Sequence, residues 1–416
     1  MKISIDGDRW LLDGELPHLG SPAEGLLVNV RMVNSVFEDD RSDLPAVLDG
    51  FAPDVNTDRF IAQISDYVAH GVRAFTLSLQ GGTPGYEGAV NSAFNADGSL
   101  RDAYLQRVSR VIRAADENGC AIILSCLYQR QHSHPRALKS QASIHNAITQ
   151  TAKWVVSEGF THVILEIANE FAHAGYANWP DGAWLRSCEG QVELIQAAKA
   201  AAPDLIVSTS GMGSGEMFES VARAGDYTII HFNNTETDAI PSRVEASKVY
   251  SKPVVCNEDD KIGPVGAEAA RLAIVSGAGW GFMHSAKNQS APFEFEGRND
   301  DPEVYDMLSR LTTAGYGPGN VAVSPIFALI TFPKDGDTFA SGDAMMIRAS
   351  VTGTQSVEGA YLEIFANDVL IGKIDSAPWR IRWENVASNT YDLVAVLRDR
   401  EGVERARSRM VDIVVA

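Results

Sequence analysis

The sequence between residues 26 and 313 alternates between short apolar runs and longer segments with helical periodicity. The apolar runs are nearly continuous in apolar character, as expected for parallel strands that are buried on both faces. We predict eight strands, at residues 26–33, 73–79, 121–128, 162–168, 205–210, 227–232, 253–257 and 279–284. We predict helices at residues 57–71, 99–119, 143–158, 187–201, 215–224, 241–250, 265–276 and 302–313. Eight strands that are each followed by a helix predict an α/β fold, a (β/α)8 TIM barrel.

A doubly wound open sheet is the alternative arrangement for the same alternation of strands and helices. That fold carries a glycine-rich phosphate-binding turn directly after its first strand. No such turn follows residues 26–33, and the glycines of "SGMGSGE" (210–216) come late in the chain. We interpret the later stretch as an ordinary loop, so the closed barrel is favoured.

The pattern changes near residue 315, after which helical periodicity is absent. "AGYGPGNVAVSP" (314–325) is a connection rich in glycine and proline. Short alternating runs separated by turn residues follow it, and such runs predict a small all-β sandwich. We therefore predict a barrel with an N-terminal hairpin at residues 1–315, a linker at 316–324 and a β-sandwich at 325–416.

Composition restricts the partners that the chain can bind. The formal net charge is −19 over 416 residues, which disfavours nucleic acid and anionic membrane because both are polyanionic. No apolar run approaches the length of about 20 residues that a membrane span needs. We expect a soluble protein, secreted or periplasmic if a signal peptide was removed and otherwise cytoplasmic. The oligomeric state stays open.

Two of the predicted strands end on an asparagine or a carboxylate in an otherwise apolar context. Glu170 ends the fourth strand and Glu258 ends the seventh. In a (β/α)8 barrel the carboxyl ends of the strands form the active face, so both side chains are expected in one cleft. Closure of the barrel is the only way to bring together two residues that lie so far apart in the chain.

Two facing carboxylates are suited to hydrolysis of a glycosidic bond. One carboxylic acid protonates the leaving oxygen, and the other carboxylate attacks the anomeric carbon or activates a water molecule. This chemistry requires neither a metal nor an organic cofactor. Two alternatives stay open: a carbohydrate-binding barrel without catalysis, and a metal-dependent barrel hydrolase or lyase that uses Asp259, Asp260 and His231.

The motifs "EIANE" (166–170) and "VCNED" (255–259) resemble the two signatures of the clan A glycoside hydrolases, the cellulase-like retaining (β/α)8 enzymes. The resemblance implies that Glu170 is the general acid/base and Glu258 the nucleophile of a β-glycosidase that cleaves a poly- or oligosaccharide. It also implies that Asn169 binds the sugar 2-hydroxyl group. It further implies that a hairpin near residues 3–14 plugs the bottom of the barrel.

The C-terminal region resembles the bacterial immunoglobulin-like modules that are appended to polysaccharide-degrading enzymes. Segments such as "APWRIRWENV" (377–386) and "YDLVAVLRDREG" (391–402) carry this resemblance. It implies an accessory role, either structural or sugar-binding. Trp379 and Trp383 lie four residues apart and hence on one face of a strand, where we expect them to pack in the core.

Other polar residues near the strand ends are candidate substrate contacts. Clan A enzymes commonly place a His or Tyr that touches the nucleophile after the sixth strand, where His231 and Asn233 lie. Met283 and His284 stand where many relatives have a tryptophan that floors the sugar subsite, and Phe171 replaces a common proline. The candidate substrate-binding residues are Asn169, His231, Arg31, Gln80, Gln129, Asn233, Trp280 and His284.

Three acidic residues near the motifs are given provisional interpretations. We interpret Asp259 and Asp260 as solvated loop charges. Glu166 shares strand parity with Glu170 and is expected to point into the barrel. A buried carboxylate needs a partner there, and Arg31 and Arg73 are the candidates.

Overall fold

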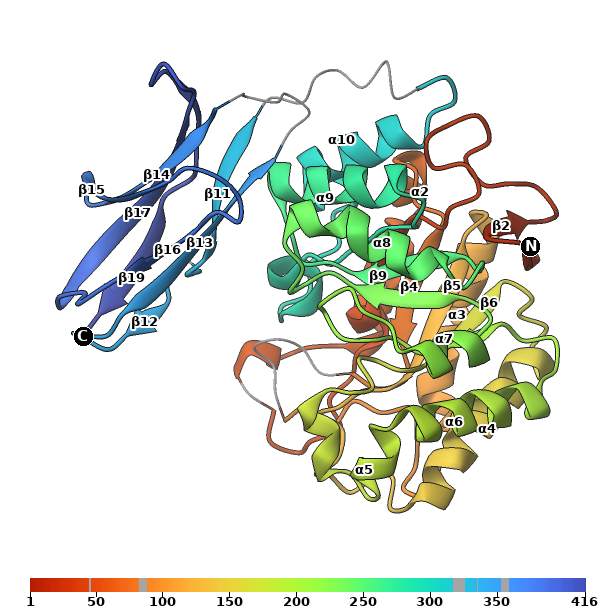
Figure 1. Cartoon of the computed structure of the whole chain (residues 1–416). Coiled ribbons are helices and arrows are strands. Elements are labelled where there is room, and N and C mark those ends of the chain that lie inside the picture. Colours follow the sequence, from red (N-terminus) through yellow and green to blue (C-terminus); the bar gives the residue numbers. More distant parts are fainter. Residues whose placement is uncertain (45, 82–87, 317–325, 335, 353–358) are drawn as a thin grey trace. The chain divides into compact units, whose positions relative to one another are not determined.

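The structure is a computed structural model that describes residues 1–416 except residues 45, 82–87, 317–325, 335 and 353–358 (Figure 1). The chain forms two compact units, a larger one that ends at residue 317 and a smaller C-terminal one. We describe each unit by itself.

In the described part of the larger unit, eight parallel strands close into a ring. Six of them form one sheet in the order β10-β3-β4-β5-β6-β7, and β8 pairs with β9. Parallel bridges between Ser210 and Ile229 and between Val255 and Gly279 join the two sheets on both sides. The strands are β3 (Asn29–Arg31), β4 (Ala74–Ser78), β5 (Ala121–Leu127), β6 (Val163–Ala168), β7 (Val207–Ser208), β8 (Thr228–His231), β9 (Val254–Glu258) and β10 (Gly281–Phe282). The predicted (β/α)8 barrel is confirmed.

Amphipathic helices alternate with the strands along the chain, and in space they cover the outside of the ring (Figure 1). One long helix shows why they form, because its buried residues Leu105, Val108, Val111 and Ile112 recur at helical spacing. The segment predicted as a single helix at residues 57–71 is instead split in two. The α-helices are α1 (Pro53–Ile61), α2 (Ile64–Ala69), α3 (Asp102–Glu117), α4 (Gln141–Ser157), α5 (Gly182–Leu185), α6 (Cys188–Ala201), α7 (Glu219–Ala224), α8 (Ile240–Lys248), α9 (Gly263–Val275) and α10 (Pro302–Leu311).

Several single-turn helices occur in the loops of the barrel. They are η1 (Val33–Val36), η2 (Ala46–Leu48), η3 (Ala174–Asn178), η4 (Thr237–Ala239), η5 (Ser285–Gln289) and η6 (Gly297–Asp300). Among the described residues no helix is long and apolar enough to cross a membrane.

An N-terminal hairpin covers one end of the barrel interior. Its strands are β1 (Ile3–Asp6) and β2 (Arg9–Leu12). Ile3 and Trp10 belong to one buried cluster with interior residues that include Ile164, Ile229 and Val255. The indole ring of Trp10 meets the ring of Tyr227, the residue before β8, edge to face at 5.2 Å. The hairpin therefore plugs the amino-terminal end of the strands, as the resemblance implied.

The smaller unit consists of strands in two sheets around a second apolar core, and the strands pair antiparallel except for β12, which runs parallel to β19. One sheet has the order β11-β13-β16, and the other has the order β12-β19-β17-β14-β15 with β18 on β17. Trp379 and Trp383 pack against the core, and Trp383 meets Tyr391 edge to face at 4.8 Å. The strands are β11 (Phe327–Phe332), β12 (Thr338–Phe339), β13 (Met345–Thr352), β14 (Tyr361–Ala366), β15 (Val369–Ile374), β16 (Arg380–Trp383), β17 (Asn389–Arg398), β18 (Glu404–Arg407) and β19 (Val411–Val415).

Candidate active site

Glu170 and Glu258 meet at the carboxyl end of the barrel. Glu258 is the last residue of β9, and Glu170 follows β6 by two residues. One carboxylate oxygen of each lies within 4.8 Å of the other and of a ring nitrogen of His231. The two glutamates are nearly buried, with 9% and 7% of their surface exposed. The structure thus brings together two carboxylates from distant parts of the sequence.

The backbone of Glu170 adopts a conformation that residues other than glycine rarely take. Its φ angle is +48°, in the left-handed region that costs free energy for a residue with a β-carbon. The Glu170 N–H donates to Ser210 Oγ at 2.8 Å, and its carbonyl accepts from the N–H of His173 at 2.7 Å. These hydrogen bonds hold the strained turn that places the carboxylate at the end of the barrel.

Arg31 connects the two halves of the site from the end of β3. Its guanidinium Nε lies 3.0 Å from Glu258 Oε2 in a buried ion pair. Another nitrogen of the same group donates to Asn169 Oδ1 at 2.8 Å. Since the planar guanidinium holds both partners at once, Arg31 fixes the carboxylate of Glu258 relative to the side chain that precedes Glu170.

Amide side chains complete the surroundings of the two glutamates. Asn233 Nδ2 donates to Glu258 Oε1, so each Glu258 oxygen faces a donor of the protein. Gln129 lies next to Asn169, with 3.5 Å between Gln129 Oε1 and Asn169 Nδ2. Because Arg31 occupies Asn169 Oδ1, the Nδ2 group is the part of that side chain left to donate to a ligand.

His231 lies at the centre of three carboxylates. Its Nδ1 is 3.2 Å from Glu170 Oε1 and 3.7 Å from Glu258 Oε2. Its Nε2 is 3.9 Å from Glu166 Oε1 on the opposite side of the ring. His231 is fully buried at the end of β8, so its charge depends on these three neighbours.

The pKa values of His231 and Glu170 shift in opposite directions. Burial lowers the pKa of His231, but the negative charges of Glu258, Glu170 and Glu166 outweigh burial and raise it. Burial raises the pKa of Glu170, but the hydrogen bond to His231 and the charges of His231, His173 and Arg31 outweigh it, so the net shift is downward. The two groups form a pair that holds one proton, mainly on the imidazole side.

The cluster of Glu170, His231 and Glu258 has the donor types of a divalent metal site. However, Arg31 lies in contact with Glu258 Oε2, and Asn233 donates to Glu258 Oε1. A guanidinium at this distance repels a cation and occupies the oxygen that a metal would use. The residues present therefore fit a metal ion poorly.

Three of the predicted substrate contacts lie outside this cluster. Trp280 is fully buried, stacks on Phe282 and donates its indole N–H to Asp259. His284 packs edge to face on Phe282, and its Nδ1 accepts from the N–H of Lys287. Strand alternation explains both positions, because residues 280, 282 and 284 share the parity that faces the helices. We therefore leave Trp280 and His284 out of the proposed site.

Gln80 is also buried, and it is held by hydrogen bonds within the protein. Its Nε2 donates to Ser92 Oγ at 3.1 Å, and its Oε1 accepts from the N–H of Tyr128. Both polar ends of the side chain therefore have partners in neighbouring loops. Gln80 supports the loop around Tyr128, and the described contacts give it no direct role at the glutamates.

Two interpretations of acidic residues are wrong. Asp259 is fully buried rather than solvated, and it accepts hydrogen bonds from Trp280 Nε1 and Lys261 Nζ, each at 2.9 Å. Glu166 is partnered by Asn257 Nδ2 at 3.0 Å rather than by either predicted arginine. Arg31 is engaged with Glu258, and the side chain of Arg73 donates to backbone carbonyls.

The predictions also missed one residue that acts on the site. The hydroxyl oxygen of Ser210 accepts from the backbone N–H of Glu170 and holds it in place. Ser210 ends the predicted strand at 205–210, and a search of every polar residue at a strand end of the barrel would have found it. Tyr128, which ends the predicted strand at 121–128, was a candidate substrate contact. Burial, and after it the charge of Glu258, raises the pKa of Tyr128 to about 12.

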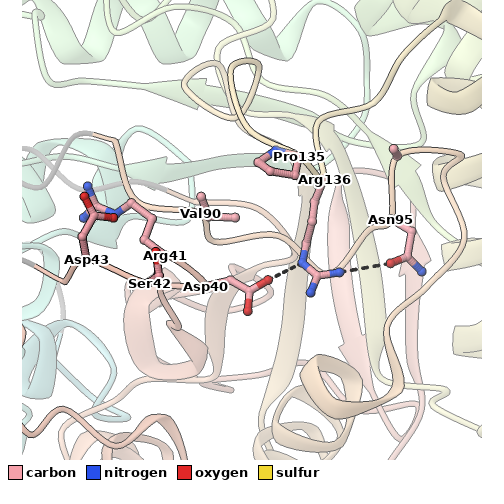
Figure 2. Close-up of a pocket in the computed structure, with 9 residues that line it drawn as sticks. Asp40, Arg41, Ser42, Asp43, Val90, Asn95, Pro135 and Arg136 are labelled. Atoms are coloured by element: carbon pink, nitrogen blue, oxygen red, sulfur yellow. Dashed lines mark hydrogen bonds and ion pairs between the residues drawn. The ribbon is translucent and has the colours of Figure 1, made fainter.

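A pocket of about 500 Å³ lies among loops at the same end of the barrel. It is lined by residues that follow β3, β4 and β5, and Figure 2 shows the side chain of Arg136 between Asp40 and Asn95. The Nε of Arg136 donates to Asp40 at 2.5 Å and another guanidinium nitrogen donates to Asn95 at 3.3 Å. Most of the residues that line it are polar, and they present both donors and acceptors.

A closed eight-stranded barrel with two facing carboxylates at its carboxyl end defines a class, the (β/α)8 glycoside hydrolases. Comparison with known families gives the same class. Residues 42–248 match the family described as cellulase (glycosyl hydrolase family 5), and residues 328–395 match the bacterial Ig domain family. The chain is a glycoside hydrolase with a glycosyl hydrolase family 5 domain of clan A followed by a bacterial Ig domain.

Solved structures support the fold at low sequence identity. A candidate glycoside hydrolase from Bacteroides vulgatus ATCC 8482 is 11% identical with a TM-score of 0.55, covering 99% of this chain and 82% of its own. The exo-β-1,4-mannosidase of Opitutaceae bacterium strain TAV5 is 11% identical with a TM-score of 0.51, and the match covers 82% of this chain and 65% of the mannosidase. No curated protein matches this chain.

Proposed function

We propose that this protein is a retaining β-glycoside hydrolase that cleaves an oligo- or polysaccharide, with Glu258 as the nucleophile and Glu170 as the general acid/base. The observation that carries the proposal is the short separation of the two carboxylates, whose nearest oxygens are within 4.8 Å. Retaining enzymes hold their carboxyl groups about 5–5.5 Å apart, whereas inverting enzymes leave about 6.5–9.5 Å for a water molecule.

The first step forms a bond between Glu258 and the anomeric carbon. As the glycosidic bond breaks, Glu170 donates a proton to the departing oxygen, and the sugar becomes an ester of Glu258. In the second step Glu170 takes a proton from a water molecule that attacks the same carbon. Glu258 then leaves as a carboxylate, and the configuration of the sugar is retained after two inversions.

The surrounding residues suit these two steps. Arg31 and Asn233 each face one oxygen of Glu258, so the nucleophile is oriented before the substrate arrives, which lowers the entropic cost of attack. The Nδ2 group of Asn169 has two N–H donors, and since only one is directed at Gln129 Oε1, the other can donate to a sugar hydroxyl next to the nucleophile. His231 and Glu170 hold the proton that the first step consumes.

The direction of the Glu170 shift is compatible with an acid role because the pair, rather than Glu170 alone, binds the proton. The imidazole Nδ1 is 3.2 Å from Glu170 Oε1, which is a hydrogen-bond distance. A proton can therefore pass to the carboxylate as charge develops on the leaving oxygen. Entry of a substrate would also expel water and favour the neutral carboxylic acid.

The loop pocket of Figure 2 supports a substrate longer than one sugar. Its residues Asp40, Asn95 and Arg136 offer the donors and acceptors that sugar hydroxyl groups require. The pocket lies among strand-end loops, as the two glutamates do. We propose that distal units of a longer saccharide bind there.

The test is covalent trapping followed by identification of the labelled residue. A 2-deoxy-2-fluoro aryl β-glycoside that matches the preferred sugar should inactivate the protein with one added glycosyl group, located on Glu258 by peptide mass spectrometry. A preliminary panel of aryl β-glycosides chooses the sugar. Proton NMR of the hydrolysis should show the β-anomer as the first product. A label on another residue, or the α-anomer as first product, would contradict the proposal.

The alternative of carbohydrate binding without catalysis is less well supported. A binding site gains nothing from two close carboxylates, one arginine and a histidine in a buried cluster, because desolvation of these charges is costly. The metal-dependent alternative is opposed by the contact between Arg31 and Glu258.

A further inference from the structure

Glu166 is a fully buried carboxylate that the proposed reaction does not use. It lies on β6, four residues before Glu170, and its side chain is completely shielded from solvent. Burial of a charged carboxylate is costly unless nearby groups compensate its charge. The negative charge of Glu166 therefore needs a positively charged group nearby.

One oxygen of Glu166 has a partner and the other does not. Oε2 accepts from Asn257 Nδ2 at 3.0 Å, and Asn257 directly precedes Glu258. Oε1 has no hydrogen-bond partner among the described residues, and the same holds for Nε2 of His231. These two atoms face each other at 3.9 Å. A small movement of either side chain would bring them into hydrogen-bond contact.

The arrangement gives the imidazole of His231 two different sides. Nδ1 faces Glu170 and Glu258, the two glutamates of the proposed reaction, and Nε2 faces Glu166. A proton on Nε2 satisfies Glu166 and leaves Nδ1 to exchange a proton with Glu170. If no carboxylate faced Nε2, no group on that side of the ring would fix the tautomer or the orientation of the imidazole.

We propose that Glu166 is a positioning residue for the proposed reaction. It faces Nε2 of His231 and fixes the imidazole in place. The His231–Glu170 pair therefore keeps the proton that the acid step consumes. The inference rests on the proposed function of Glu170. No proton is gained or lost by Glu166 itself. The pair gives one proton to the leaving oxygen in the first step and recovers one from water in the second.

The charges around His231 make the effect of Glu166 predictable in sign. The ring is faced by Glu166 and Glu170 from the β6 segment and by Glu258 from β9. Arg31 from β3 neutralises Glu258 at 3.0 Å. All three carboxylates raise the pKa of His231 against the effect of burial. Removal of the Glu166 charge must therefore weaken proton binding by the pair, wherever within the pair the proton resides.

The experiment compares Glu166→Gln with Glu166→Asp and with Ser125→Ala. Ser125 is a matched control, because it pairs with Glu166 in the sheet register and is buried, with no partner for its hydroxyl group. The first readout is the pH profile of kcat/KM for an aryl β-glycoside with a poor leaving group. Its basic limb reports loss of the proton from the acid/base pair.

In Glu166→Gln the basic limb should move to lower pH by about 1 unit, the lower end of the effect of a charge at this distance. In Glu166→Asp the basic limb should lie much closer to its wild-type position than in Glu166→Gln. In Ser125→Ala it should stay at the wild-type position. KM should change little, since Glu166 has no exposed surface for a substrate. A substrate with an activated leaving group, which needs no protonation, should be hydrolysed at nearly the wild-type rate.

An unmoved limb in Glu166→Gln, or an equal shift in Ser125→Ala, would overturn the inference. An equal loss of rate for both leaving groups would do the same, because it indicates a structural role. If Glu166→Gln does not fold, Glu166→Asp replaces it: its shorter side chain draws the carboxylate away from Nε2 of His231, so a smaller shift of the basic limb to lower pH supports the inference, and a limb at the wild-type position contradicts it.

A second readout does not depend on activity. Nitrogen NMR of histidine-labelled protein, with His231→Asn used for assignment, follows the titration and tautomer of His231 directly. A lowered His231 pKa in Glu166→Gln supports the inference even if no glycoside is cleaved, in which case the proposed function alone fails. An unchanged pKa and tautomer contradict the inference even if Glu258 is trapped as proposed.

Discussion

The two ends of the barrel interior are built from the same strands but have opposite chemistry. At the amino-terminal end the interior is apolar, and residues such as Ile164 and Ile229 pack with Ile3 and Trp10 of the hairpin. Toward the carboxyl end the next inward positions on the same strands are Glu166 and His231, followed by Glu170. Along β6 and β8 the change takes two residues, the distance between successive inward side chains.

The difference shows how one fold separates stability from function. The apolar end buries hydrophobic surface and closes the barrel to water, which stabilises the ring. The polar end contains Arg31, His231 and carboxylates, several of them fully buried, whose desolvation costs stability. Substitutions at the two ends should therefore affect different quantities, which the following predictions test.

The largest expected effect is on activity at the polar end. Glu258→Gln keeps the size of the side chain but removes the nucleophile, so kcat on an aryl β-glycoside should fall on the order of 10⁴-fold. Thermal unfolding should show some loss of stability, because the buried guanidinium of Arg31 loses its charged partner, so kcat is compared for protein that is still folded at the assay temperature. Retention of a tenth of the wild-type activity in both Glu258→Gln and Glu258→Ala would refute the assignment.

A stability effect of intermediate size is expected at the apolar end. Trp10→Ala removes a buried indole from the plug of the barrel, so the free energy of unfolding should fall by about 3–5 kcal/mol. The kcat of the protein that stays folded should match the wild type, since Trp10 lies at the opposite end from Glu258. Urea denaturation and activity assays measure the two quantities, with Trp10→Phe as the conservative control. A fall in kcat without loss of stability would break the distinction between the ends.

The smallest effect should come from the loop pocket, which lies at the same end as the polar cluster but outside the barrel interior. Arg136→Ala removes a donor group there, and one hydrogen bond contributes about 0.5–1.5 kcal/mol. KM for long oligosaccharides should therefore rise severalfold, while kinetics on an aryl monoglycoside stay unchanged. Arg110→Ala, which breaks an exposed ion pair with Asp54 on the outer helices, is the control. Equal effects on short and long substrates would mean that the pocket binds no distal sugar.

Much of the fold could be predicted because the local pattern and the global fold agree. Strands buried on both faces read as continuous apolar runs, and each observed strand of the barrel lies within a predicted one, except that β9 extends one residue beyond its predicted end, to Glu258. The break in the helix predicted at residues 57–71 was missed, since residues 62 and 63 carry no strong helix-ending signal. The motifs also placed Glu170 and Glu258 correctly at strand ends, because a polar residue that ends an apolar run stands out.

Side-chain partners were harder to predict because they depend on ring closure and on strand parity. Trp280 was a candidate substrate contact in the sequence, yet its parity turns it toward the helices, where its indole N–H donates a hydrogen bond to Asp259. Asp259 in turn read as a solvated loop residue, although Lys261 and Trp280 bury and satisfy it. Neither partner is deducible from a single segment.

The sequence by itself determined the order of strands and helices, the change to a β-sandwich after residue 315 and the positions of two acidic strand ends. These features depend on local hydrophobic periodicity, which any short window of the chain displays. Only the tertiary structure decided that Arg31 holds both Glu258 and Asn169, and that His231 stands between Glu166 and the two glutamates. Those contacts join residues from different strands, and electrostatic interaction depends on distance in space rather than on separation along the chain.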